Sequence, residues 1–269
     1  MADTDSEFSG SIPTFYDRYL GPMNCAPYAA DLAVRVKALA PARVLEVAAG
    51  TGIVTRAIVQ VLPAGAKIVA TDLNQPMLDF AAVQPGVERV VWRQADAQQL
   101  PFEDESFDVV VCQFGVMFFP DRIAGYREAR RVLRPGGRYL FNVWDRIEEN
   151  EFTAVIHAAV AAFFPDDPPR FLTRTPFGCH NVATIQEELK RAGFDRTEMA
   201  TVALRSRAPL ARDPAVGMCE GTPLRSEIEA RDATHLAEAT DAAARALAAR
   251  FGPGPIDGKI QAHVVTVTR

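Results

Sequence analysis

The chain has 269 residues, 48% of them hydrophobic and 23% charged, so it can bury a sizeable core without disulfides or structural metals. Its net charge is -5 and it contains no long basic run, which argues against a nucleic-acid partner because nucleic-acid affinity needs positive charge against the phosphates. The four cysteines form no Cys-x-x-Cys pair and the four histidines have no metal-ligand spacing, so we expect reduced thiols and no metal.

The N-terminal region is polar at first and then helical. Residues 1–12 lack the apolar core of a signal peptide, and we expect them to be disordered. Residues 14–39 have a helical pattern that breaks at Gly21-Pro22. The longest apolar stretches of the chain, near 107–119 and 154–164, are too short to span a bilayer. We therefore expect a cytoplasmic protein with no membrane span.

Residues 42–144 alternate short apolar strands with amphipathic helices. The helices are expected after the Gly50–Gly52 turn, from Asn74, and over Asp121–Leu133, and the strands at Arg43–Ala48, Lys67–Thr71, Val87–Gln94, Phe107–Cys112 and Arg138–Trp144. This alternation is typical of a parallel sheet covered by helices on both faces. The predicted fold is therefore α/β, doubly wound and Rossmann-like.

The second half is less regular. It shows helical patterns at 152–164 and 182–192, half-exposed strand patterns at 194–206 and 259–268, and a helical insert at roughly 213–251. We interpret residues 1–269 as a single domain with a core at 41–145. The other parts of that domain are N-terminal helices at 1–40 and lid insertions at 146–181 and 207–256.

Two motifs follow the first two strands of the core. Ala48-Ala49-Gly50-Thr51-Gly52 is a turn whose glycines let the backbone approach a ligand, although a turn without a ligand would look similar. Asp72, 20 positions after Gly52, can accept both hydroxyls of a ribose, or it can cap the helix that follows. Both motifs lie at the carboxyl ends of strands, where open α/β sheets bind their ligands.

Two more motifs follow the third and fourth strands. Asp96-Ala97 can accept from the exocyclic amine of an adenine, or Asp96 can cap its own loop. Gln113 and Phe114 end the fourth strand at the same crevice, whereas we expect Met117, Phe118 and Phe119 in the core.

Taken together, the motifs resemble the class I S-adenosylmethionine-dependent methyltransferases, and within them the subgroup that includes the ubiquinone/menaquinone biosynthesis methyltransferases. The resemblance covers 42–144 in detail and is carried by Glu46-x-Ala48-x-Gly50-x-Gly52, Asp72, Asp96-Ala97, Phe107-Asp108 and Leu133-Arg134-Pro135-Gly136-Gly137. It implies a sheet of seven strands with the last one antiparallel. It also implies S-adenosylmethionine as cofactor, held by Glu46, Ala48, Gly50, Thr51, Gly52, Asp72, Leu73, Met77, Asp96, Ala97, Gln113 and Phe114.

Position 48 departs from the family pattern, which usually has glycine there. Alanine fits beside a ligand if its φ is negative, so we expect a negative φ at Ala48 and retained cofactor binding.

The choice of cofactor has one rival. Gly50-x-Gly52-x-x-Thr55 nearly matches a dinucleotide fingerprint, so a nicotinamide-dependent oxidoreductase is an alternative. A pyrophosphate, however, needs free N–H groups without an acid beside them. Glu46 next to the turn suits the sulfonium and ammonium groups of S-adenosylmethionine better.

Substrate contacts are expected from Tyr16 and Tyr19 in the N-terminal helices and from Asn142 and Trp144 at the end of the fifth strand. His180, in a loop, is the candidate general base, although a loop histidine is more often structural. We predict in-line methyl transfer to a small-molecule acceptor. A second alternative is a protein that binds the cofactor but catalyses no reaction. The acceptor atom stays open, and so does a homodimer.

Overall fold

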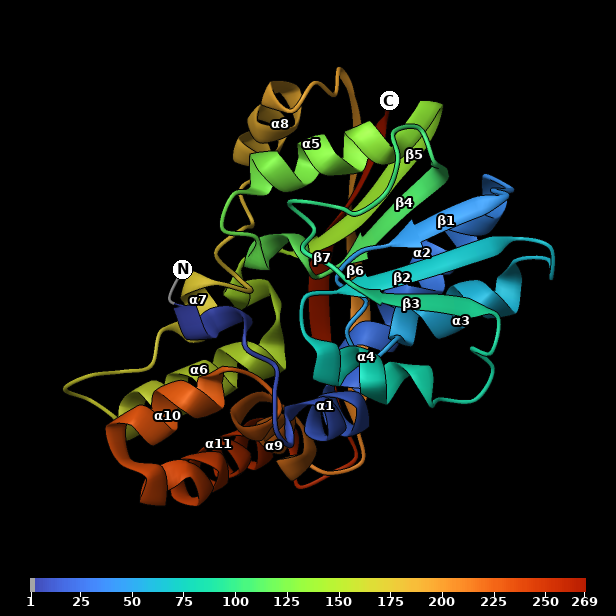
Figure 1. Cartoon of the computed structure of the whole chain (residues 1–269). Coiled ribbons are helices and arrows are strands. Elements are labelled where there is room, and N and C mark those ends of the chain that lie inside the picture. The colour runs from blue at the N-terminus through green and yellow to red at the C-terminus, as the bar shows by residue number, and fades with distance from the viewer. Residues whose placement is uncertain (1–2) are drawn as a thin grey trace.

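The structure, a computed structural model that describes residues 3–269, is organised around a seven-stranded sheet (Figure 1). The strand order is β3-β2-β1-β4-β5-β7-β6. The strands are β1 Arg43–Glu46, β2 Lys67–Asp72, β3 Val90–Gln94, β4 Phe107–Gln113, β5 Leu133–Trp144, β6 Arg196–Ala208 and β7 Ile256–Thr268. The first five are parallel, and β7 is antiparallel to both β5 and β6. The predicted doubly wound α/β fold with an antiparallel last strand is confirmed.

The parallel strands are buried because helices cover both faces of the sheet. Val44 and Leu45 of β1 and Val109–Cys112 of β4 are almost fully inaccessible, and this explains their continuous apolar sequence. On one face lie α2 Ala26–Ala38 and α3 Ile53–Val61, which pack against each other. On the other face lie α5 Arg122–Val132 and α8 Val182–Arg191, joined by an ion pair between Arg122 and Glu188. Figure 1 shows α5 and α8 together at the top of the molecule.

The N-terminal region differs from its prediction in two ways. Asp3–Ser6 form a 3-10 helix, η1, so the expectation of disorder is wrong for them, while residues 1–2 lie outside the described residues. After α1 Ile12–Phe15 the chain forms a ten-residue π-helix, η2 Tyr16–Cys25, which continues into α2. The predicted break at Gly21-Pro22 is therefore also wrong, because both residues lie inside this wider helix.

The remaining helices form short connections and a helical cap. The connections are α4 Gln75–Ala82, η3 Val116–Phe118 and η4 Ile147–Glu149. The cap consists of α6 Glu151–Phe163, α7 Phe171–Arg174, α9 Arg212–Glu220, α10 Leu224–Asp232, η5 Ala233–His235 and α11 Leu236–Phe251. The predicted insert at 213–251 is thus a group of separate helices between β6 and β7. Within residues 3–269, no helix has the length and apolar character needed to cross a membrane.

Candidate active site

A cavity lies where the core loops meet the cap. Its core side is formed by residues that follow β1, β2, β3 and β4, and its other side by the N-terminal segments, the 171–177 region and α9. Its lining residues include Ser6, Phe8, Tyr16, Leu20, Asn24, Cys25, Glu46, Ala48, Gly50, Thr51, Asp72, Leu73, Asn74, Met77, Asp96, Ala97, Gln113, Phe114, Met117, Phe118, Phe119, Trp144, Phe171, Phe177, Met218 and Thr222. Segments far apart in the sequence therefore build one site.

The turn after β1 brings the backbone to the edge of the cavity. Gly50 has a φ of 55° and Gly52 a φ of 78°, both in the left-handed region that favours glycine. A Cβ on Gly52 would also lie 3.0 Å from the Trp92 ring and 3.1 Å from Ala81 Cβ. Gly52 caps α3 and does not line the cavity, whereas Gly50 and Thr51 do.

Ala48 lines the cavity in a conformation that was not expected. Its φ is 52°, so the prediction of a negative φ is wrong. The turn requires the left-handed region here, and the methyl group is tolerated because Gly115 faces it. A Cβ on Gly115 would lie only 2.4 Å from Ala48 Cβ, so the two positions share the space of a single methyl group.

Asp72 is a buried carboxylate at the centre of the core loops. One of its oxygens accepts the Gly50 N–H at 2.8 Å and the other accepts the Asn74 N–H at 2.8 Å. Burial raises the pKa of Asp72, and these backbone hydrogen bonds act in the opposite direction. Asn74, not Asp72, is the N-cap residue of α4, so capping does not account for the position of Asp72.

Glu46 is the second acid and lies at the end of β1. Its carboxylate accepts a 2.6 Å hydrogen bond from the Thr55 hydroxyl. Burial raises the pKa of Glu46 to about 8, with the Thr55 hydrogen bond acting against it.

The third acid, Asp96, is exposed and accepts the N–H of Gln98 at 2.8 Å. Ala97 lies beside it, and Leu73 and Met77 provide apolar surface on the same side of the cavity. Leu73 lines the cavity and is 50% exposed, so it lies at the cavity edge.

An aromatic cluster forms the far wall. Phe114, with a φ of 54°, stacks on Trp144 at a ring separation of 3.7 Å and an angle of 7°. Tyr28 packs edge-on against both rings, and Phe177 lies 5.9 Å from the Trp144 ring. Such a left-handed backbone at a bulky residue is typical of functional sites.

Gln113 is held between two neighbours. Its Nε2 donates to the carbonyl of Cys25 at 3.0 Å, and its Oε1 accepts from Asn142 Nδ2 at 3.3 Å. Asn142 is fully buried and does not line the cavity, so it reaches the site only through Gln113.

Of the other residues predicted to contact the substrate or to act as a base, some line the cavity and some do not. Tyr16 lines the cavity, with its hydroxyl 3.3 Å from Cys25 Sγ, and Trp144 lines it as well. Tyr19 stacks on Phe15 at 6.0 Å and does not line the cavity. The structure also does not bring His180 into the cavity. His180 is exposed, and its Nδ1 lies 2.8 Å from the carbonyl of Phe177.

Sequence reasoning missed much of the cap side. Met117, Phe118 and Phe119 are in the core or pack against it, as expected, and they also line the cavity. The lining residues that were not predicted are Phe8, Leu20, Asn24, Cys25, Phe171, Phe177, Met218 and Thr222. Most of them are apolar, and an apolar pattern does not separate a wall of the cavity from the core.

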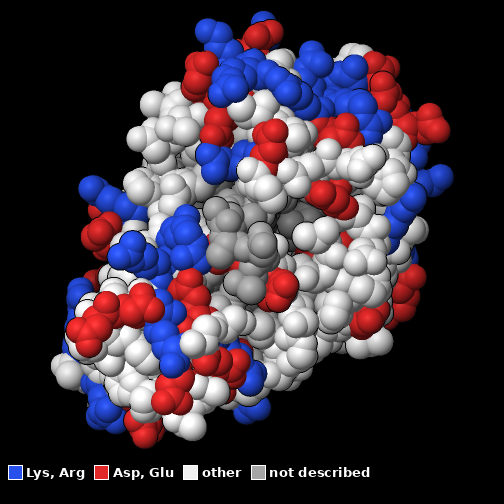
Figure 2. All heavy atoms as spheres, turned by 60° about the vertical axis from the view of Figure 1, so that its left-hand side comes forward, with Lys and Arg blue, Asp and Glu red and all other residues white. Residues whose placement is uncertain are grey.

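The charge of the cavity is one-sided. Glu46, Asp72 and Asp96 line it, and among residues 3–269 no Lys, Arg or His lines it. Figure 2 shows many basic side chains at the top of the molecule, the end at which α5 and α8 lie, and others along its left side among acidic ones. The site therefore suits a ligand that is cationic at one end and uncharged elsewhere.

Comparison with known proteins agrees with this chemistry. A family model described as a methyltransferase domain matches residues 45–141. A ubiquinone/menaquinone biosynthesis C-methyltransferase of Pseudomonas savastanoi is 31% identical over 167 residues, which cover 57% of this chain and 65% of the relative. A demethylmenaquinone methyltransferase of Clavibacter sepedonicus is 41% identical over 106 residues, which cover 38% and 42%. An uncharacterized protein of Mycobacterium tuberculosis is 44% identical over 101 residues, which cover 35% and 34%. The chain thus spans between about a third and two thirds of these curated relatives.

Solved structures show the same fold at low identity. The YcgJ protein of Bacillus subtilis has a TM-score of 0.59 and 21% identity, and the alignment covers 90% of this chain and 98% of that one. A phosphoethanolamine N-methyltransferase of Haemonchus contortus, in complex with S-adenosyl-L-methionine, has a TM-score of 0.60 and 17% identity, with coverages of 100% and 60%. The family match, the sheet order and the strand-end motifs agree in describing residues 45–141 as a methyltransferase domain.

Proposed function

We propose that the protein transfers the methyl group of S-adenosylmethionine to a small, uncharged and mainly apolar acceptor. The observation that carries the proposal is a cavity that combines three acidic side chains with aromatic rings and to which the described part of the chain contributes no basic side chain.

The residues present fit this cofactor. Asp72 is suited to the ribose hydroxyls, since its oxygens already lie at the cavity edge, held by two backbone N–H groups. Asp96, with apolar Leu73 and Met77 nearby, is suited to the adenine and its amine. Glu46 and the ring of Phe114 are suited to the positively charged end of the molecule.

The same contacts disfavour a dinucleotide. The N–H of Gly50, which a pyrophosphate would need, is bonded to the Asp72 carboxylate. The buried Asp72 beside the turn, a hydrogen-bond acceptor and not a donor, would also disfavour a pyrophosphate. A nicotinamide-dependent oxidoreductase is therefore the weaker candidate.

The bound cofactor would supply an activated methyl group on a good leaving group, and the chain's own task is alignment and exclusion of water. The apolar wall around Phe114 and Trp144 serves both needs. Burial raises the pKa of the Tyr16 hydroxyl far above its ordinary value and that of the Cys25 thiol to about 11, so near neutral pH both are hydrogen-bonding groups and not bases. With His180 outside the cavity, we propose that the acceptor's proton leaves to solvent.

The acceptor class follows from what the cavity lacks. A phosphate-bearing acceptor, such as the one named for the phosphoethanolamine N-methyltransferase, would need a basic partner. An uncharged ring, as in the demethylmenaquinone named for the methyltransferase of Clavibacter sepedonicus, matches the aromatic lining better. A cytoplasmic location stays a prediction from the composition.

Calorimetry with S-adenosylhomocysteine tests the cofactor assignment. We expect Asp72→Ala to weaken binding by tenfold or more, about 1.4 kcal/mol, with Asp72→Asn intermediate because it keeps one acceptor oxygen. Asp166→Asn, at an exposed position of the cap loop, is the control and should bind normally. The proposal would be contradicted if Asp72→Ala bound S-adenosylhomocysteine as tightly as the wild type does, or if the wild type bound NAD more tightly than S-adenosylhomocysteine.

A panel of uncharged aromatic acceptors, with methyl-labelled cofactor, tests the reaction itself. Label in a neutral acceptor but not in its phosphorylated analogue is the expected result. Binding of the cofactor without labelling of any acceptor would favour a binding module without turnover.

A further inference from the structure

The first described residues of the chain take part in the cavity. Ser6 and Phe8 line it, although neither belongs to the methyltransferase domain at 45–141. Figure 1 shows this dark-blue segment passing from the region of α7 to α1, along the side of the molecule where cap and core meet. Residues Asp5–Phe8, which we call the strap, therefore connect the two sides of the site.

The strap is fixed to the cap by a buried acid. Asp5 is 1% exposed and accepts hydrogen bonds from Arg174 Nε at 3.0 Å and from the Thr175 hydroxyl at 2.6 Å. Arg174 also forms an ion pair with Glu227 of α10 at 2.7 Å. A buried carboxylate is stable only when it is paired and fully hydrogen-bonded, so this contact specifies one position of the strap.

At its other end the strap is fixed to the core by Asn74. The Asn74 side chain donates to the carbonyl of Ser6 at 3.0 Å and accepts the N–H of Phe8 at 3.3 Å. The backbone N–H of the same Asn74 donates to Asp72 at 2.8 Å. Asn74 thus links the strap directly to Asp72, the acid that we assign to the ribose.

Phe8 places its ring against the cavity. The ring packs edge-on against Phe118 at 5.6 Å and against Tyr16 at 6.1 Å, and both of these neighbours line the cavity too. An aromatic ring in that position adds apolar surface to the site and excludes water from it.

We infer that the strap is a binding element that has to release for the cofactor to be exchanged, with Phe8 as its contact to the bound molecules and Asp5 and Asn74 as its two anchors. The inference rests on the proposed function. A short segment held by a few polar contacts can open locally at a small fraction of the free energy of global unfolding. When it opens, the link that it forms between Arg174 of the cap and Asn74 of the core is lost.

Stopped-flow measurement of S-adenosylhomocysteine dissociation tests the inference. Asp5→Asn and Phe8→Ala should each speed dissociation by about tenfold, because each removes a contact that keeps the strap closed. Asp241→Asn is the matched control, since it also loses a pairing between an aspartate and an arginine, Arg212, but lies on α11 away from the strap. Thermal unfolding of all variants checks that they remain folded.

Hydrogen exchange of the ligand-free protein separates this inference from the proposed function. The amide of Phe8 should lose protection in Asp5→Asn and keep it in Asp241→Asn. Unchanged dissociation in both folded strap variants would overturn the strap's role while leaving the methyltransferase proposal intact. Failure of the wild type to bind S-adenosylhomocysteine at all would overturn both.

Discussion

At the scale of single residues, Glu46 has the most informative ionisation in the cavity. It is 1% exposed, its pKa is raised by burial to about 8, and its nearest hydrogen-bond donor is the neutral Thr55 hydroxyl. Near neutral pH the ligand-free protein therefore holds most of this group protonated. A positive charge bound beside it would favour the carboxylate and lower its pKa.

We predict that cofactor binding releases a proton from Glu46. Calorimetry at about pH 7 in buffers with different ionisation enthalpies should report proton release by the wild type and almost none by Glu46→Gln. Affinity should rise between about pH 6 and about pH 7.5, because less work is then needed to deprotonate the acid. Proton release that is unchanged in Glu46→Gln would assign the titration to another group.

The ligand-free protein provides the control for this prediction. A carboxyl whose folded-state pKa lies above its unfolded-state value binds more protons when folded, so its contribution to stability is complete below the unfolded value and is lost as pH rises to about 8. The melting temperature should accordingly fall less steeply with pH in Glu46→Gln than in the wild type.

The sequence predicts which residues at strand ends belong to the site. It does not predict a residue's conformation where that conformation depends on contacts with other segments. Asp72 ends β2 and Asp96 lies two residues after β3, and the carboxyl ends of parallel strands meet at one edge of the sheet. The methyl group of Ala48 fits in its left-handed conformation because Gly115, in another segment, has no side chain. The orientation of His180 depends on a local hydrogen bond to the carbonyl of Phe177, which its sequence context does not reveal.

At the scale of elements, the π-helix η2 is the segment whose structure the sequence predicted least well. Tyr16, Leu20, Asn24 and Cys25 of this helix all line the cavity. The sequence predicted an interruption because Gly and Pro usually end α-helices. The hydrogen-bond pattern of a π-helix is decided by packing, here against α9 and β6, and local propensity does not encode it.

Gly217 permits the close approach of α9 to η2. A Cβ at this position would lie 2.9 Å from Leu20 Cδ2 and 3.0 Å from Tyr19 Cβ. We predict that Gly217→Ala lowers the free energy of unfolding by about 1–3 kcal/mol through overpacking. Because Leu20 and Met218 both line the cavity, the same change should raise the KM for the acceptor more than that for the cofactor.

Denaturant unfolding and steady-state kinetics of two alanine variants check this prediction. Gly65→Ala is the matched control, since a Cβ at Gly65 would meet nothing within 4 Å and its φ is not left-handed. If Gly217→Ala proves as stable as Gly65→Ala, the contact between α9 and η2 is not tight.

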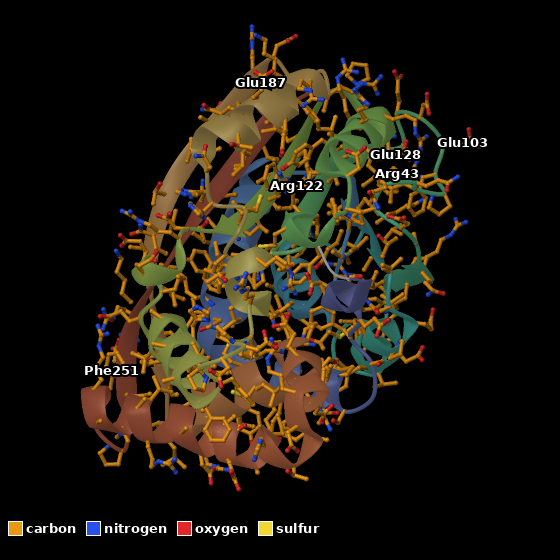
Figure 3. All side chains as sticks on the ribbon, turned by 90° about the vertical axis from the view of Figure 1, so that its left-hand side faces the viewer. Arg43, Glu103, Arg122, Glu128, Glu187 and Phe251 are labelled. Atoms are coloured by element: carbon orange, nitrogen blue, oxygen red, sulfur yellow. The ribbon has the colours of Figure 1, made fainter. Side chains whose placement is uncertain are left out.

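At the scale of the whole molecule, cap and core are joined through the sheet itself. Helices α9, α10 and α11 are inserted between β6 and β7, which pair along their whole length from Arg196–Thr268 to Ala208–Ile256. Figure 3 shows Phe251, at the end of α11, and Arg43, at the start of β1, at opposite ends of the molecule. The core was predictable because each of its motifs is local, whereas the cavity wall joins segments some 200 residues apart.

This architecture predicts that the cofactor stabilises the cap as well as the domain that binds it. Hydrogen exchange with and without S-adenosylhomocysteine should show increased protection in the 72–74 loop and also around Arg174 and in α9, because all three regions surround the same cavity or its strap. In Asp72→Ala, at equal ligand concentration, both increases should shrink together. Protection confined to residues 45–141 would show that the cap closes on the acceptor alone, and the contacts of Asp5 and Asn74 would then be independent of cofactor binding.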